Sequence, residues 1–229
     1  SLSTSDDILG IELSPKKVED WLREVSYHEN PEYVPSDFAL EFIAFIKLVN
    51  GVEGEENKSP VFHLEMLDKI QRNDKDTINL CHRGSAKTTL LGSYLFLYLA
   101  TYGDLPGFGK VAYAIYVTDA IESLVKKMRL DLEFRWQSSE FLQEWVPFAK
   151  FTDVRWEFKN KDGNRFVVSA HGAKTGVRGT KEFGTRPVLA VLDDLISDDD
   201  ARSETIIASV EDTVYKAVDY ALHPQRRKV

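Results

Sequence analysis

One segment of the sequence, Thr77–Thr89 (TINLCHRGSAKTT), has residues that could hold a phosphate group. A short apolar stretch leads into a turn that contains Gly84, and Lys87 then precedes Thr88 and Thr89 where a helix is expected to begin. In a Walker A loop, backbone N–H groups point at the phosphates, the lysine bridges the β- and γ-phosphates, and the adjacent hydroxyl ligates Mg²⁺. The segment therefore predicts a nucleotide phosphate loop.

The segment departs from the pattern G-x-x-x-x-G-K-[ST] at both glycine positions, which hold Cys81 and Ala86. The alternative interpretation is an ordinary strand–turn–helix with a surface lysine. Against this alternative, Arg83 and Lys87 lie together at one helix start, where cations are electrostatically unfavourable unless an anion binds. The predicted phosphate-contacting residues are Arg83, Gly84, Ser85, Ala86, Lys87, Thr88 and Thr89.

The second chemical element is the apolar run Val188–Leu192, which ends in Asp193 and Asp194. A continuous apolar run is typical of a strand buried on both faces of a parallel sheet, and its carboxyl end delivers side chains to the crevice where such sheets bind ligands. This is the Walker B form, with Asp193 predicted to hold Mg²⁺ and Asp194 to orient or deprotonate the attacking water. The alternative interpretation is an acidic turn at the surface, and the Walker A-like segment upstream argues against it.

Alternating strand and helix patterns must position these residues, and they predict an α/β fold with a mostly parallel sheet flanked by helices. The expected strands are 77–80, 111–118 and 188–192, with a hairpin of 154–158 and 165–170 across Asp162-Gly163. The expected helices are 61–70, 88–102 and 119–136, the last capped by Asp119.

The N-terminal region has a different pattern. Residues 1–13 are read as a loose tail, and Ser14-Pro15 opens a first helix. A second helix is expected over 37–49, closed by Asn50-Gly51, with an apolar stripe that predicts packing on the main core. We divide the chain into a tail and helical extension, residues 1–58, and an ATPase-like core, residues 59–229.

Composition limits the class of protein. The 229 residues carry 37 acidic and 29 basic side chains, a net charge of −8, and 43% hydrophobic residues. This argues against a dedicated basic nucleic-acid binder, whose pI is usually above about 9, although a local basic groove stays compatible. No apolar run reaches the roughly 18–20 residues of a membrane span. A single cysteine, Cys81, and a polar start indicate a reducing, cytosolic setting.

Four stretches read in order resemble the ATPase domain of the large terminase subunit, the DNA-packaging motor of tailed bacteriophages. They are HRGSAKTT, VAYAIYVTDAIESLVKKM, HGAKTGVRGTKEFGTRP and VLAVLDDLISDDDARSE. The resemblance implies an ASCE-type P-loop NTPase fold and Mg²⁺-dependent ATP hydrolysis that moves double-stranded DNA into a procapsid. It also implies a homo-oligomeric ring on the portal protein, the small terminase subunit as a further partner, and action in the host-cell cytoplasm.

The resemblance assigns roles to the phosphate-site residues. Lys87 would contact the phosphates, Thr88 and Asp193 would hold Mg²⁺, and Arg83 would sense or stabilise the γ-phosphate. Asp194 falls where the catalytic glutamate usually stands, and it is one methylene shorter.

It also assigns roles to residues outside the two motifs. Arg178 would reach the nucleotide of a neighbouring subunit; the alternatives are pairing with a local carboxylate or contact with DNA. Phe62, His63 and Gln71 would lie near the adenine; helix packing is the alternative.

The family continues past Walker B into a coupling motif and a nuclease, so we expect this chain to be the N-terminal ATPase part. Two other interpretations stay open. One is a different P-loop, nucleic-acid-dependent ATPase of helicase type, and the other is a non-catalytic nucleotide-binding fragment.

Overall fold

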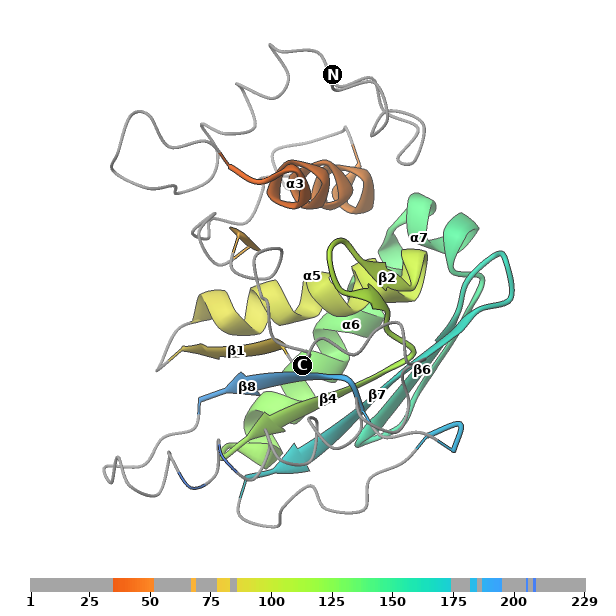
Figure 1. Cartoon of the computed structure of the whole chain (residues 1–229). Coiled ribbons are helices and arrows are strands. Elements are labelled where there is room, and N and C mark those ends of the chain that lie inside the picture. Colours follow the sequence, from red (N-terminus) through yellow and green to blue (C-terminus); the bar gives the residue numbers. More distant parts are fainter. Residues whose placement is uncertain are drawn as a thin grey trace.

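A computed structural model describes residues 35–51, 67–68, 78–82, 86–173, 182–184 and 187–194, together with residues 205 and 208. The helices are α3 (Asp37–Asn50), α5 (Ala86–Tyr102), α6 (Lys126–Ser138) and α7 (Glu140–Trp145), with a π-helical turn, η3 (Ile121–Val125), before α6 (Figure 1). The strands are β1 (Ile78–His82), β2 (Asp104–Leu105), β3 (Gly109–Lys110), β4 (Tyr113–Thr118), β5 (Phe148–Phe151), β6 (Arg155–Lys159), β7 (Arg165–Gly172) and β8 (Leu189–Asp193).

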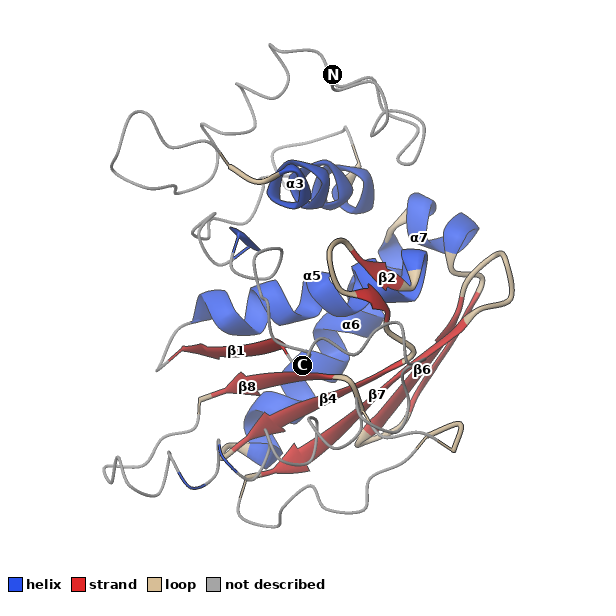
Figure 2. Ribbon diagram, in the orientation of Figure 1, coloured by secondary structure: helices blue, strands red, loops and turns tan. Residues whose placement is uncertain are grey.

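Six of the strands form one mixed sheet in the order β1-β8-β4-β7-β6-β5, while β2 and β3 form a separate small ribbon (Figure 2). Strands β1, β8, β4 and β7 run parallel, and β6 and β5 add to the sheet antiparallel. The sheet and its helices confirm the α/β class. The finer assignment to an ASCE-type P-loop NTPase stays a prediction.

Helix α5 lies between the sheet and α3, as the layers in Figure 1 show. Its side chains from Leu91 to Ala100 are almost all buried, as expected of a helix covered on both sides. Gly92 allows α5 to lie close to the sheet, since a Cβ there would come within 3.2 Å of the Val191 side chain. The same Cβ would also lie 3.5 Å from the side chain of Met128 on α6.

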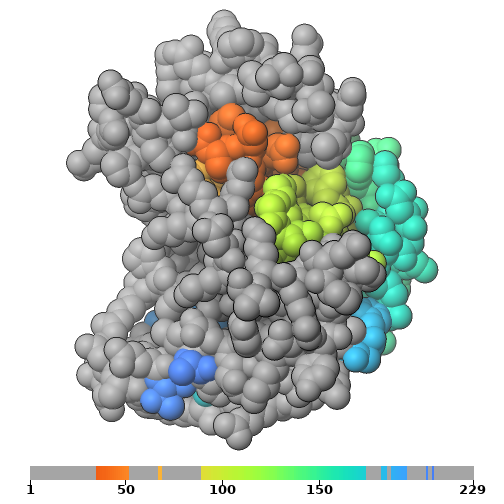
Figure 3. All heavy atoms as spheres, in the orientation of Figure 1, coloured from red at the N-terminus to blue at the C-terminus, as the bar shows by residue number. Residues whose placement is uncertain are grey.

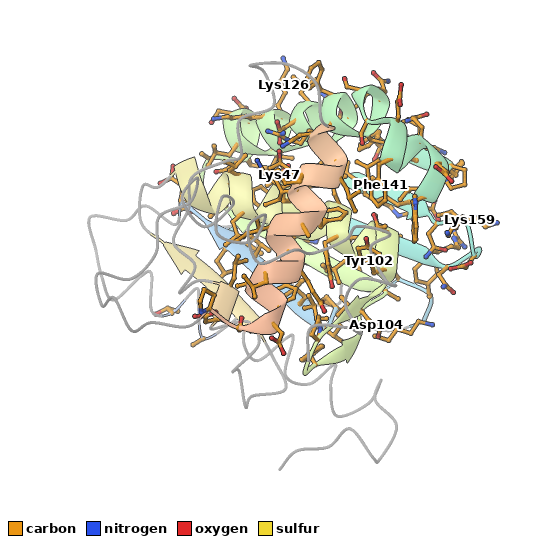
Figure 4. All side chains as sticks on the ribbon, turned by 90° about the horizontal axis from the view of Figure 1, so that it is seen from above. Lys47, Tyr102, Asp104, Lys126, Phe141 and Lys159 are labelled. Carbon is orange, nitrogen blue, oxygen red and sulfur yellow. The ribbon has the colours of Figure 1, made fainter. Side chains whose placement is uncertain are left out.

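Helix α3 packs on α5 with an aromatic face. Its start is capped by Ser36, whose hydroxyl accepts a hydrogen bond from the Ala39 N–H, and it ends at Gly51 with a φ of 76°. Seen from above, α3 crosses over α5 (Figure 4), and Tyr102 and Phe141, both labelled there, contact Phe45. The predicted packing of this helix on the main core is therefore confirmed.

All five predicted stripe residues of α3 are buried: Phe38, Phe42, Phe45, Ile46 and Val49. Burying each such side chain stabilises the fold by roughly 1.5–3 kcal/mol. Part of the outer side of α3 reaches the visible surface in Figure 3, beside the region of β2 and β3.

Several predicted elements are confirmed with shifted ends. The hairpin across Asp162-Gly163 forms as β6 and β7, the run after Val188 forms β8, and helix 88–102 begins two residues earlier, at Ala86. The predicted first helix, residues 14–25, lies outside the described residues, and of the helix over 61–70 only Leu67 and Asp68 are described, in helical conformation.

The predicted cap at Asp119 is wrong. The segment after β4 begins at Ile121 as a π-helical turn whose start carries no side-chain cap hydrogen bond. The Thr118 hydroxyl instead accepts a hydrogen bond from the Ala120 N–H at 3.1 Å. This local bond turns the chain at the end of β4 and leaves the Asp119 carboxylate to other interactions.

Candidate functional site

The carboxyl ends of the four parallel strands meet at one edge of the sheet. The pairing register places His82 of β1 beside Asp193 of β8, Asp193 beside Thr118 of β4, and Thr118 beside Gly172 of β7. Helix α5 begins at Ala86, soon after the end of β1, so its amino end lies at the same edge. Ligands of open α/β sheets bind in the crevice at this edge.

Asp193 is the most buried acidic group at the edge, at 1% exposed. One of its carboxylate oxygens, Oδ2, accepts two hydrogen bonds: one from the Thr89 hydroxyl and one from the Tyr116 hydroxyl at 2.7 Å. Thr89 is itself buried in the first turn of α5. The first turn of α5, which carries Lys87, is therefore joined directly to the end of the acidic strand β8.

Tyr116 is fully buried, and its ring lies against Phe96 of α5 and Trp156 of β6, with centroid distances of 6.3 and 6.2 Å. Burial raises the pKa of its hydroxyl far above the ordinary value, and the charge of Asp193 raises it further. The phenol is therefore neutral at any physiological pH and donates to the carboxylate. Sequence reasoning missed this residue; the available signal was that a buried tyrosine hydroxyl needs a partner.

Asp194 follows directly after β8 with a φ of 47°, a value that non-glycine residues seldom adopt. Its Oδ1 atom is buried and has no hydrogen-bond partner among the described residues. Burial raises the pKa of Asp194, and the carboxylates of Asp193 and Asp119 raise it further. A carboxylate with a raised pKa is a better proton acceptor, which suits a general base.

The oxygen chemistry at the edge fits a magnesium ion. Mg²⁺ is usually held by one or two carboxylates together with phosphate oxygens and water, so it needs no cage made of protein alone. Within the part of the chain that the structure describes, no three His, Cys, Asp or Glu side chains form a metal site by themselves. The buried Asp193 and the Oδ1 atom of Asp194, which has no hydrogen-bond partner in the described part of the chain, supply oxygens of the required kind.

The structure places some predicted site residues and not others. Asp193, Asp194 and Thr89 come together at the edge, and Ala86, Lys87 and Thr88 form the first turn of α5, of which the backbone is described. The remaining predicted residues lie outside the described part of the chain: Arg83, Gly84, Ser85, Phe62, His63, Gln71 and Arg178. Their proposed contacts stay predictions.

A second polar cluster lies on the other face of the sheet, on β6 and β7. Arg155 donates to both carboxylate oxygens of Glu182, at 2.6 and 3.1 Å, and Arg165 donates to Glu157. Burial alone would raise the pKa of Glu157, but the hydrogen bond and charge of Arg165, helped by Arg155, hold it below the ordinary value. The pair of Arg155 with Glu182 attaches residue 182 to the sheet, whereas the pair of Arg165 with Glu157 joins β7 to β6.

Next to these ion pairs, a chain of hydrogen bonds runs from Tyr113 to Ser169 at 2.5 Å and from Ser169 to His171 at 2.8 Å. Burial lowers the pKa of His171. All three side chains lie on the face of the sheet opposite Tyr116, as the alternation along β4 and β7 requires.

Comparisons with protein-family models, curated proteins and solved structures found no match to this chain. The resemblance to terminase ATPase domains therefore rests on the four sequence stretches.

Proposed function

We propose that this chain is the ATP-hydrolysing part of a viral DNA-packaging motor of the large-terminase type. The observation that carries the proposal is the hydrogen bond between Thr89 and Asp193. It joins the first turn of α5, which carries Lys87, to the acidic end of β8. Phosphate-binding loops and metal-binding carboxylates must meet at one edge to act on the same nucleotide.

In the proposed mechanism, Lys87 contacts the β- and γ-phosphates. Thr88 and Asp193 would hold Mg²⁺, which would neutralise phosphate charge. Asp194 accepts a proton from the water that attacks the γ-phosphorus, and its raised pKa favours this role. The bond from that phosphorus to the β–γ bridging oxygen breaks, so that ADP and phosphate are released.

Arginines complete the site. Arg83 stabilises the γ-phosphate from the same chain, and Arg178 does so from a neighbouring subunit. Phe62, His63 and Gln71 contact the adenine.

The proposed partners follow from the same assignment. They are double-stranded DNA, the portal protein, the small terminase subunit, and further copies of the chain in a ring on the procapsid, in the host-cell cytoplasm. The net charge of −8 is compatible with a motor that grips DNA transiently. No helix among the described residues is long and apolar enough to cross a membrane.

Equilibrium binding of Mg·ATP tests the phosphate loop. Lys87→Ala should abolish binding, while Lys159→Ala should leave it unchanged, because Lys159 (labelled in Figure 4) lies on the end of β6 that pairs with the start of β7, away from the site. Unchanged affinity in the Lys87 variant would show that the loop assignment is wrong.

Turnover measurements separate the motor from the alternatives. ATP hydrolysis that rises with portal-bearing procapsids and DNA supports a packaging motor. Strand unwinding without procapsids would point to a helicase-type ATPase instead, and binding without any turnover would point to a non-catalytic nucleotide-binding module.

A further inference from the structure

The two hydrogen bonds on Asp193 come from elements of different kinds. Thr89 belongs to α5, the helix that begins just after the predicted phosphate loop. Tyr116 belongs to β4, which pairs along its length with β8, so its hydroxyl is fixed relative to the strand that carries Asp193. A shift of the helix start would move the first donor and leave the second in place.

The aromatic core fixes the Tyr116 ring. Phe96 meets it at an interplanar angle of 88° and Trp156 at 44°, and all three side chains are fully buried. The buried Tyr116 hydroxyl donates to the Asp193 carboxylate at 2.7 Å, and the Thr89 hydroxyl lies beside it. A donor held this firmly restricts the rotation of the carboxylate it binds.

Both donors reach the same oxygen. Among the described residues, the hydrogen bonds to Asp193 go to Oδ2, which makes Oδ1 the oxygen available to a cation. A carboxylate fixed through one oxygen presents the other in a single direction, which a metal with strict octahedral geometry requires.

We infer that Tyr116 is a positioning residue that orients Asp193 for a divalent cation at the nucleotide site. This inference rests on the proposed function. Tyr116 touches neither nucleotide nor metal; it acts through Asp193. When a residue that hydrogen-bonds a metal-binding side chain is removed, metal affinity typically falls by roughly 10- to 100-fold.

The test is Mn²⁺ binding to the whole chain in the presence of a non-hydrolysable ATP analogue, followed by electron paramagnetic resonance. Tyr116→Phe keeps the ring and removes the hydroxyl. Tyr113→Phe is the matched control, because Tyr113 lies on the same strand and is equally buried but bonds Ser169 on the opposite face. Affinity for the analogue without metal is measured in parallel.

We expect Tyr116→Phe to weaken Mn²⁺ binding by roughly 10-fold or more, with metal-free nucleotide affinity unchanged and Tyr113→Phe like wild type. Equal Mn²⁺ affinity in all three proteins would overturn the inference and leave the proposed function standing. Equal losses of metal-free and metal-dependent binding would make Tyr116 a packing residue and also overturn it. If the wild-type chain binds no Mn²⁺ with the analogue, the proposed function itself fails.

Discussion

The hydroxyl of Thr89 provides a stability test that needs no ligand. Thr89→Val keeps a β-branched side chain of similar shape and removes the donor to Asp193. Since Thr89 is 8% and Asp193 1% exposed, water cannot replace the lost bond. A hydrogen bond to a charged group contributes about 1.5–3 kcal/mol, so we expect the free energy of unfolding to fall by that amount.

Thr101→Val is the matched control on the same helix. Thr101 is also buried, but its hydroxyl bonds the Leu97 carbonyl one turn back, a contact that contributes little to helix stability. Its loss should cost less than about 1 kcal/mol. The assay is thermal unfolding, where a chain of this size shifts its Tm by roughly 2–4 °C for each kcal/mol. Equal Tm values for the two variants would refute the reasoning that Thr89 ties α5 to the acidic strand.

Three further outcomes follow from burial and charge. Asp194→Asn should raise the Tm at pH 7, because the fold disfavours the ionised carboxylate, which is why its folded pKa is raised, and asparagine stays neutral. The variant should still bind nucleotide but lose turnover, and an unchanged or lower Tm would contradict the reasoning. The lowered pKa of Glu157 stabilises the fold above the ordinary pKa of 4.5, and this stabilisation is lost as pH falls below it. Glu157→Gln should therefore make the Tm less sensitive to acid, and identical pH–Tm curves for variant and wild type would contradict this. Phe45→Ala should cost about 3–5 kcal/mol of unfolding free energy, whereas Phe134→Ala, 68% exposed, should cost almost none; similar Tm losses would contradict the packing of α3 on the core.

Local patterns were sufficient to predict much of the fold. The apolar runs of β4 and β8 and the turn at Asp162-Gly163 carry short-range signals, and α3 has both a capping serine and a closing glycine. These features depend on residues close together in the sequence, so one sequence is enough to predict them.

The strand order could not be predicted in the same way. The place of β8 between β1 and β4 depends on contacts between residues about a hundred positions apart, which no local pattern encodes. Short elements such as β5 and α7 were also missed, because a run of four to six residues carries little periodicity.

At the candidate site, too, the residues set by local sequence were predicted and the one set by long-range contacts was not. Asp193, Asp194 and Thr89 were predicted from the spacing of charged and hydroxyl residues around apolar runs. Tyr116 was not, since its role depends on the diagonal neighbour that the parallel register of β4 and β8 brings close. The wrong cap at Asp119 has a similar origin, because the hydroxyl of Thr118 competes for the turn.

The most direct test of the account is the effect of Mg²⁺ on ATP affinity, measured by calorimetry for the wild-type chain and for Asp193→Asn. The account predicts that Mg²⁺ strengthens ATP binding by the wild type and that the variant binds ATP without this gain. The same dependence on Mg²⁺ in both proteins, or no binding of ATP by the wild type, would contradict the claim that this edge of the sheet is a Mg·ATP site.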